Sequence, residues 1–149
     1  MVVDPDEAEV FPQIASGVLV NLGTYRPGDR ESMEAAIRGS VKAHTPWVFD
    51  PVAVGGLGPR TQYAREAVKN QPAVIRGNAS EILGLAGEAS GGKGVDAGDS
   101  VDSAVCAAKK LVALYGSIVA ISGEKDAIYG HGCSALSLIH ISDGAREAC

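Results

Sequence analysis

The 149 residues of the chain are enough for one domain with a real hydrophobic core, and a second domain is not expected. The 13 basic and 18 acidic residues give a net charge of -5, which argues against binding to nucleic acid or to an anionic membrane surface. The three cysteines lack the spacing of a metal site or of a disulfide framework. The sequence also has no basic secretion signal and no apolar run near the ~18 residues of a membrane helix. These features favour a cytoplasmic protein with small-molecule partners.

The first part of the chain is predicted to contain two strand-and-helix units. Residues 14–23 hold a near-continuous apolar run, which is typical of a buried parallel strand. Asp29 is predicted to cap the following helix, whose apolar residues recur at intervals of three and four. Residues 47–50 form a second apolar run, and Pro51 keeps Asp50 out of helical geometry, so the Asp50 carboxylate is expected at a strand end.

The middle of the chain repeats this alternation. Residues 54–59 form a glycine-rich loop that lacks the residue order of a phosphate-binding loop, and Thr61 is predicted to cap the helix after it. Residues 72–75 are a short apolar run and predict a third strand. An apolar helix closed by Gly87 follows a sharp strand-to-helix junction, whose free N–H groups favour an anion.

The last predicted helix is the most strongly amphipathic one. It is expected to start at a cap formed by Asp99 or Ser100 and to end at Gly116. Residues 117–121 then predict another buried strand. This alternation of strands and helices predicts the α/β class, with right-handed crossovers and a mostly parallel sheet covered by helices on both faces.

Polar side chains stand at the predicted strand ends, where the carboxyl ends of parallel strands meet. The Asn78 and Glu81 pair has the spacing of a capping box, and a glutamate at this helix start can also hold hydrated Mg²⁺ near phosphates. Arg76 either pairs with Asp50 or Glu81, or offers its planar guanidinium to a phosphate chain. Ser122 either caps a turn or bonds a phosphate oxygen. We expect these side chains to converge on one site.

The histidines and cysteines do not combine into a reactive site. His44 is expected at a helix end, where an imidazole satisfies the last carbonyl groups. His131, Cys133 and His140 support neither a nucleophile and base pair nor a metal cluster.

Five segments, in order and at compatible spacing, resemble hydroxyethylthiazole kinase, a thiamine-salvage enzyme of the ribokinase-like superfamily. They are residues 19–24, 45–55, 74–82, 93–96 and 122–126. The resemblance implies a three-layer α/β/α ribokinase-like fold. It also implies transfer of the γ-phosphoryl group of ATP to the hydroxyl of 4-methyl-5-(2-hydroxyethyl)thiazole.

The resemblance assigns roles to individual residues. Arg76 and Ser122 are similar to the family's ATP-contacting positions, and Met1 is similar to a methionine that packs on the thiazole. Asp50, with the Asn78 and Glu81 pair, matches the positions that organise Mg²⁺ and phosphate. The resemblance implies a homotrimer with the thiazole site between subunits.

The sequence also departs from the family. The resemblance runs from residue 1 to 126, as a partial kinase domain, whereas family chains are nearly twice as long. Residues 130–133 are similar to the family's Gly-Thr-Gly-Cys segment, which supplies an anion hole and a cysteine, but they follow Ser122 without the expected intervening hairpin. No catalytic residue is therefore assigned.

The end of the chain is expected to lie outside the family. Residues 127–149 are interpreted as a non-family tail, because residues 136–142 resemble the translation of a transposon-end adapter. The alternative function is a catalytically inactive fragment that binds nucleotide at most. A kinase for a pyrimidine alcohol is a third interpretation, and the central segments favour the thiazole enzyme over it.

Overall fold

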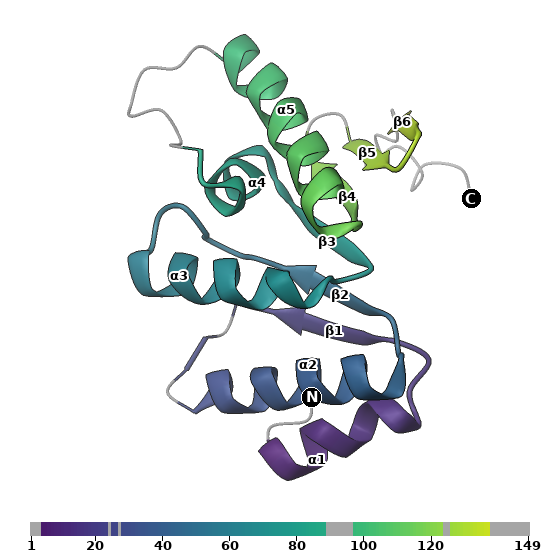
Figure 1. The fold of residues 1–149 in the computed structure, drawn as a ribbon. Helices are drawn as coiled ribbons and strands as arrows, with labels where there is room; N and C mark the ends of the chain where they lie inside the picture. The colour runs from purple at the N-terminus through teal and green to yellow at the C-terminus, as the bar shows by residue number, and fades with distance from the viewer. Residues whose placement is uncertain (1–3, 24, 27, 89–96, 124–125, 138–149) are drawn as a thin grey trace, which may run out of the picture.

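The computed structural model describes residues 4–23, 25–26, 28–88, 97–123 and 126–137 (Figure 1). Strands and helices alternate through most of the chain, as the sequence predicts. In chain order the elements are α1 (Pro5–Val10), η1 (Phe11–Gln13), β1 (Val18–Asn21), α2 (Asp29–Ala43), β2 (Trp47–Asp50), α3 (Gly58–Ala67), η2 (Val68–Asn70), β3 (Val74–Asn78), α4 (Ala79–Ala86), α5 (Ala97–Tyr115), β4 (Ile118–Ser122), β5 (Asp126–Gly130) and β6 (Cys133–Ser137).

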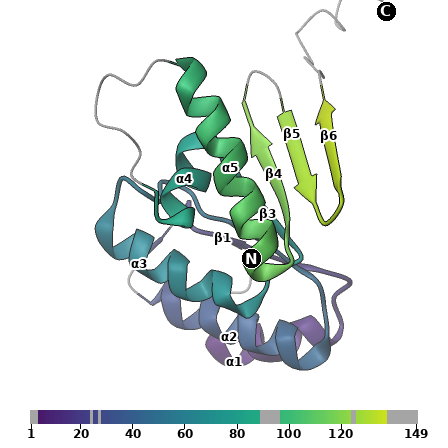
Figure 2. The ribbon, with the colours of Figure 1, turned by 45° about the horizontal axis from the view of Figure 1, so that its top comes forward.

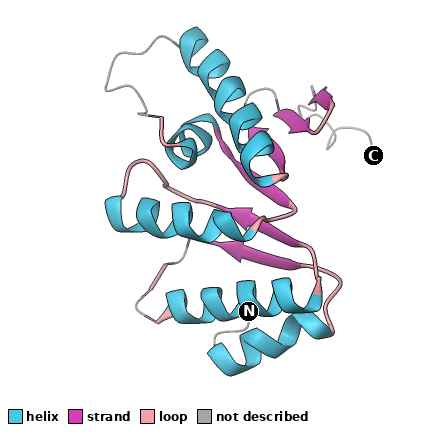
Figure 3. Cartoon of the chain, in the orientation of Figure 1, coloured by secondary structure: helices cyan, strands magenta, loops and turns pink. Residues whose placement is uncertain are grey.

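The six strands within the described residues belong to one sheet, in the order β1-β2-β3-β4-β5-β6. The first four strands are parallel, and β5 and β6 continue the sheet as an antiparallel hairpin at one edge (Figure 2). Figure 3 shows the strands in magenta among the cyan helices. The register places Asn21 opposite Asp50 and Asn78 opposite Ser122. The predicted α/β class and mostly parallel sheet are therefore confirmed.

The helices from α2 to α5 lie on one face of the sheet, and α1 packs on α2 (Figure 2). Phe49, Ile75 and Val119 point into the core beneath these helices and are fully buried. Leu19 and Ile118 point to the other face and stay 63% and 46% exposed. Right-handed crossovers between neighbouring parallel strands bring successive helices to the same side. Of the three expected layers, the described residues supply two.

Local chemistry explains why α1 forms, although the sequence analysis did not predict it. The Asp4 carboxylate accepts hydrogen bonds from the N–H groups of Asp6 and Glu7, at 3.0 and 3.1 Å, and so caps the helix. α1 then crosses α2 at Gly39, where a Cβ atom would collide with the carbonyl of Glu9. Glycine is therefore required at this crossing.

Four predicted helix ends can be compared with the structure. The prediction that Asp29 caps α2 is wrong, because Gly28 is the cap residue and Asp29 is the first residue of the helix. His44 ends α2 as expected, but it does so in the left-handed conformation and through its backbone N–H. α3 begins at Gly58, so the prediction that Thr61 caps it is wrong. α5 begins at Ala97, before the predicted cap at residue 99 or 100. None of the helices within the described ranges is long and apolar enough to cross a membrane.

Candidate functional site

The junction between β3 and α4 contains the predicted capping box. Asn78 Oδ1 accepts the N–H of Glu81 at 3.0 Å, and Glu81 Oε2 accepts the N–H of Asn78 at 2.9 Å. Gly77 makes room for this arrangement, because a Cβ atom there would lie 3.2 Å from Glu81 Oε2. A larger residue at position 77 would therefore crowd the Glu81 side chain that completes the capping box.

Glu81 also ties a second loop to the junction. Its other oxygen, Oε1, accepts the N–H of Ala53 at 2.9 Å, and Ala53 has the left-handed φ of 62°. Two further contacts fix the same loop: Gly55 donates its N–H to Thr61 Oγ1 at 2.8 Å, and its backbone lies directly against Gly84. The loop after β2 is therefore held rigidly beside the start of α4.

Asp50 and Arg76 meet at the carboxyl edge of the sheet. Pairing with Asp50 was one of the two alternatives predicted for Arg76. Arg76 Nη1 lies 3.5 Å from Asp50 Oδ2, and the same oxygen accepts a hydrogen bond from Asn21 Nδ2 at 2.9 Å. The Asp50 side chain is 14% exposed and the Arg76 side chain 61% exposed. A largely buried carboxylate thus sits beside an accessible guanidinium.

Asn21 is a site residue that the sequence analysis missed. It ends β1 directly beside the end of β2, and its Oδ1 accepts the N–H of Gly23 at 2.6 Å. The signal in the sequence was an asparagine two residues before a glycine at the end of an apolar run, which is typical of an Asx turn. That pattern predicts only a turn, and the register of β1 with β2 shows that Asn21 also faces Asp50.

The electrostatic environment of Asp50 combines opposing effects. Burial raises the pKa of the Asp50 carboxyl above its ordinary value, and the nearby charge of Glu81 raises the pKa further. The Arg76 guanidinium and the hydrogen bond from Asn21 lower the pKa and so favour the charged form. The carboxylate is therefore stabilised by these two partners against the cost of burial.

The strand register places the remaining predicted residues on the same edge. Ser122 ends β4 opposite Asn78, and Arg76 lies opposite Ala120, two residues earlier on that strand. Because side chains alternate along a strand, Asp50, Arg76, Asn78 and Ser122 share the face that no described helix covers. Such a set offers a guanidinium and a hydroxyl to an anion, and a carboxylate to a cation. Met1 lies outside the described residues.

The predicted metal ligands differ in how free their oxygens are. Asn78 Oδ1 already accepts from Glu81 and from the Ser80 hydroxyl, and both Glu81 oxygens accept backbone N–H groups. Asp50 Oδ1, in contrast, has no donor among the residues that the structure describes. No group of three or more acidic, histidine or cysteine side chains within those residues is placed to hold a metal. Asp50 is the member of the set that best fits Mg²⁺, which needs few carboxylates when waters and phosphates complete its shell.

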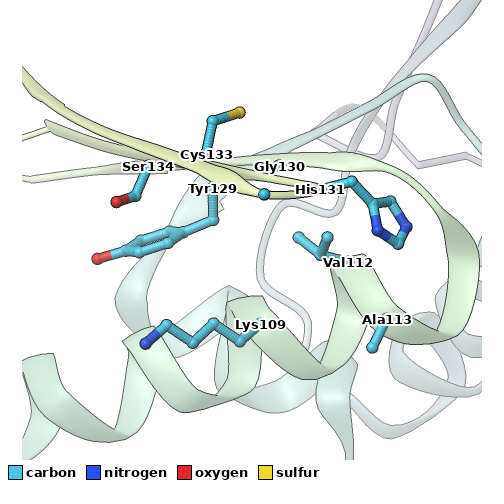
Figure 4. A pocket seen from close by; sticks show the side chains of 9 residues that line it. Lys109, Val112, Ala113, Tyr129, Gly130, His131, Cys133 and Ser134 are labelled. Carbon is cyan, nitrogen blue, oxygen red and sulfur yellow. The ribbon is translucent and has the colours of Figure 1, made fainter.

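Cys133 and His131 lie far from this edge, in the turn of the β5–β6 hairpin (Figure 4). The turn lies at the amino end of β4, near Ile118, whereas Ser122 lies at the carboxyl end. A cavity of about 380 Å³ separates this turn from Lys109 and its neighbours on α5, and the Cys133 thiol points away from Lys109. Residues 126–137 form a hairpin that the sequence analysis did not predict, and residues 130–133 lie at its turn.

Comparisons with known proteins agree on one family. A family model described as "HK: Hydroxyethylthiazole kinase family" matches residues 1–145. The chain is 53% identical over 128 residues to a hydroxyethylthiazole kinase of Corynebacterium glutamicum, covering 86% of the chain and 48% of that relative. It is 48% identical over 147 residues to a hydroxyethylthiazole kinase of Pectobacterium atrosepticum, covering 99% of the chain and 51% of the relative. The chain therefore spans about half the length of the curated relatives it matches.

Solved structures show the same likeness in three dimensions. A hydroxyethylthiazole kinase protein from Pyrococcus horikoshii OT3 superposes with a TM-score of 0.79 at 25% identity, over 93% of this chain and 51% of that one. A pyridoxal kinase of Bacillus subtilis superposes with a TM-score of 0.57 at 24% identity, over 83% of this chain and 48% of that one, and shows the fold alone.

Proposed function

The chain belongs to the hydroxyethylthiazole kinase family, and we propose that its site residues serve transfer of the γ-phosphoryl group of ATP to the hydroxyl of 4-methyl-5-(2-hydroxyethyl)thiazole, in thiamine biosynthesis and salvage. The observation that carries the proposal is the Asp50–Arg76 pair, which lies at the carboxyl edge of the parallel strands. Ligands of open α/β sheets bind outside this edge. Acting alone, the chain binds the nucleotide and does not complete the transfer.

In this proposal Arg76 binds the phosphate chain of ATP. Its guanidinium is exposed enough to meet a ligand and carries the planar donors that match phosphate oxygens. Ser122 donates its hydroxyl to a phosphate from the neighbouring strand, and Met1 packs on the thiazole, as the family resemblance implies. Phosphoryl transfer depends mainly on positioning and on charge stabilisation, and these side chains contribute to positioning ATP and the thiazole.

Asp50 is the residue that would hold Mg²⁺, through Oδ1, together with waters and the phosphates of ATP. The bound ion would neutralise charge on the phosphate oxygens. Asn78 and Glu81 are the weaker part of the metal prediction, because backbone N–H groups already occupy their oxygens. Their role is to hold the start of α4 and the loop after β2 in place.

The same proposal includes the compartment and the assembly. The cytoplasm supplies ATP and therefore fits the reaction. The homotrimer that the family resemblance implies stays a prediction, which sedimentation equilibrium of the purified chain tests directly.

Calorimetric titration with ATP and Mg²⁺ tests the nucleotide part of the proposal. We expect Arg76→Ala to weaken ATP binding by about 10-fold or more, the cost of one hydrogen bond to a charged group. Arg38→Ala is the matched control, because the exposed Arg38 on α2 pairs with Glu9 on α1 at 3.1 Å and, among the described residues, with no residue of the site. Equal affinities for the wild type and Arg76→Ala would remove Arg76 from the site.

A phosphorylation assay tests the remaining part. The chain is mixed with ATP, Mg²⁺ and the thiazole alcohol, and the phosphorylated alcohol is measured by chromatography. We expect no product, because residues 130–133, which are similar to the family's anion-hole segment, lie at the opposite end of β4 from Ser122, and loss of such donors costs a large factor in rate. Product above background would overturn the statement that the chain alone does not complete the transfer.

A further inference from the structure

The side-chain amide of Asn21 is oriented from both of its ends. Its oxygen accepts the N–H of Gly23 at 2.6 Å, and its nitrogen donates to Asp50 Oδ2 at 2.9 Å. An amide has an acceptor at one end and donors at the other, so engagement of the oxygen fixes the direction of the nitrogen. The turn after β1 therefore sets the position of a donor that faces β2.

Asp50 connects Asn21 to Arg76 on the next strand, β3. The oxygen that accepts from Asn21 is also the one that lies 3.5 Å from Arg76 Nη1. Anchored through Oδ2, the carboxylate keeps Oδ1 free of donors from the described part of the chain. Three adjacent strands are thus connected by a row of side chains, in the order Asn21, Asp50 and Arg76.

Arg76 needs such an anchor because its side chain is 61% exposed. A free arginine side chain loses up to about 2 kcal/mol of conformational entropy when a ligand immobilises it. A partner that limits its rotamers before binding reduces this loss. The carboxylate can do this only if the carboxylate itself is held, and Asn21 is the neutral donor that holds it.

We propose that Asn21 is a positioning residue that acts through Asp50 to orient the guanidinium of Arg76 for a phosphate ligand. The statement that the ligand is the phosphate chain of ATP rests on the proposed function. The competing explanation is that Asn21 only shapes the turn, because its oxygen lies within 2.8 Å of the Cβ position of Gly23.

Asn21→Asp separates these two explanations. The variant keeps an oxygen for the N–H of Gly23 but replaces the donor that faces Asp50 with a second carboxylate. Asn21→Ala removes both interactions. Asn70→Asp is the matched control, since the Asn70 amide donates to the carbonyl of Ala67 at the end of α3, away from the site.

The test uses the full chain labelled with ¹⁵N, and its first readout is the Nε–Hε resonance of Arg76 without ligand. We expect Asn21→Asp and Asn21→Ala to shift this resonance and Asn70→Asp to leave it in place. In an Asp50→Ala background the shift caused by Asn21→Ala disappears, because the connection between the two residues is gone. An Asn21→Asp spectrum that matches the wild type at Arg76, or a shift that persists in Asp50→Ala, would overturn the proposal.

The second readout is ATP affinity, measured by calorimetry for the same variants. Loss of one hydrogen bond of ordinary strength corresponds to about a fivefold weaker affinity for Asn21→Asp. If the Arg76 resonance shifts in the variants as expected but the wild-type chain does not bind ATP, the proposed function is overturned and the positioning role of Asn21 stays supported. ATP binding that is unchanged in Asn21→Asp would overturn the role of Asn21 in phosphate binding.

Discussion

Glu81→Gln is the substitution that best separates a structural from a metal-binding role for this glutamate. Each carboxylate oxygen of Glu81 accepts a backbone N–H, one from Ala53 and one from Asn78, both at 2.9 Å. A glutamine keeps one acceptor and turns an NH₂ group toward the other N–H. Since a hydrogen bond to a charged group is worth about 1.5–3 kcal/mol, we expect the free energy of unfolding to fall by about 2 kcal/mol.

Urea denaturation without Mg²⁺ or nucleotide measures this loss. Glu88→Gln is the matched control, because Glu88 is an exposed carboxylate 3.7 Å from Lys110 and should change stability by less than about 0.5 kcal/mol. A loss for Glu81→Gln as small as that of the control would refute the structural role. A loss that appears only when Mg²⁺ and ATP are present would show that Glu81 is a metal ligand.

Two further substitutions test the packing described above. Gly84→Ala should destabilise the chain by about 1–3 kcal/mol, because a Cβ atom there would lie 2.7 Å from the Gly55 backbone, whereas Gly58→Ala, which meets no atom within 4 Å, should be neutral or slightly stabilising. Urea denaturation of both variants checks this, and equal effects would contradict it. Tyr63→Phe should leave stability unchanged or raise it by up to about 1 kcal/mol, because the buried Tyr63 hydroxyl has no partner in the part of the chain that the structure describes. Burial raises the pKa of Tyr63, so above the ordinary tyrosine pKa of about 10 the unfolded chain loses a proton that the folded chain keeps, and stability falls as pH rises. Tyr63→Phe should reduce this alkaline loss between pH 8 and 11, and an unchanged pH dependence would contradict the buried environment.

The elements around the site could be predicted because local rules determine them. The capping box at Asn78 and Glu81 needs only its own spacing, and the left-handed ends at His44 and Gly87 follow the usual chemistry of helix termini. The predicted start of α3 was wrong. The Thr61 hydroxyl does not cap the helix but forms hydrogen bonds with Gly55 and Leu57 in the loop before it. The competing partner, Gly55, is visible only in three dimensions.

The site was predicted in part, for a similar reason. Convergence of Asp50 and Arg76 followed from the rule that the carboxyl ends of parallel strands share an edge, and the structure places the two side chains 3.5 Å apart. Asn21 was missed because its contact with Asp50 depends on the register of β1 with β2. The hairpin after Ser122 was missed because its strands carry no strong alternating pattern and were interpreted by resemblance alone.

The strand order of the sheet has a consequence for the growing polypeptide. In the part of the chain that the structure describes, each strand after β1 is paired with the strand made just before it, so none of the strands β2 to β6 needs a later strand to begin pairing. The sheet can therefore extend from β1 outward as the chain leaves the ribosome, and each crossover helix can dock as soon as its two strands exist. A ribosome-bound nascent chain that ends after β3 should already protect the backbone amides of β2 from hydrogen exchange.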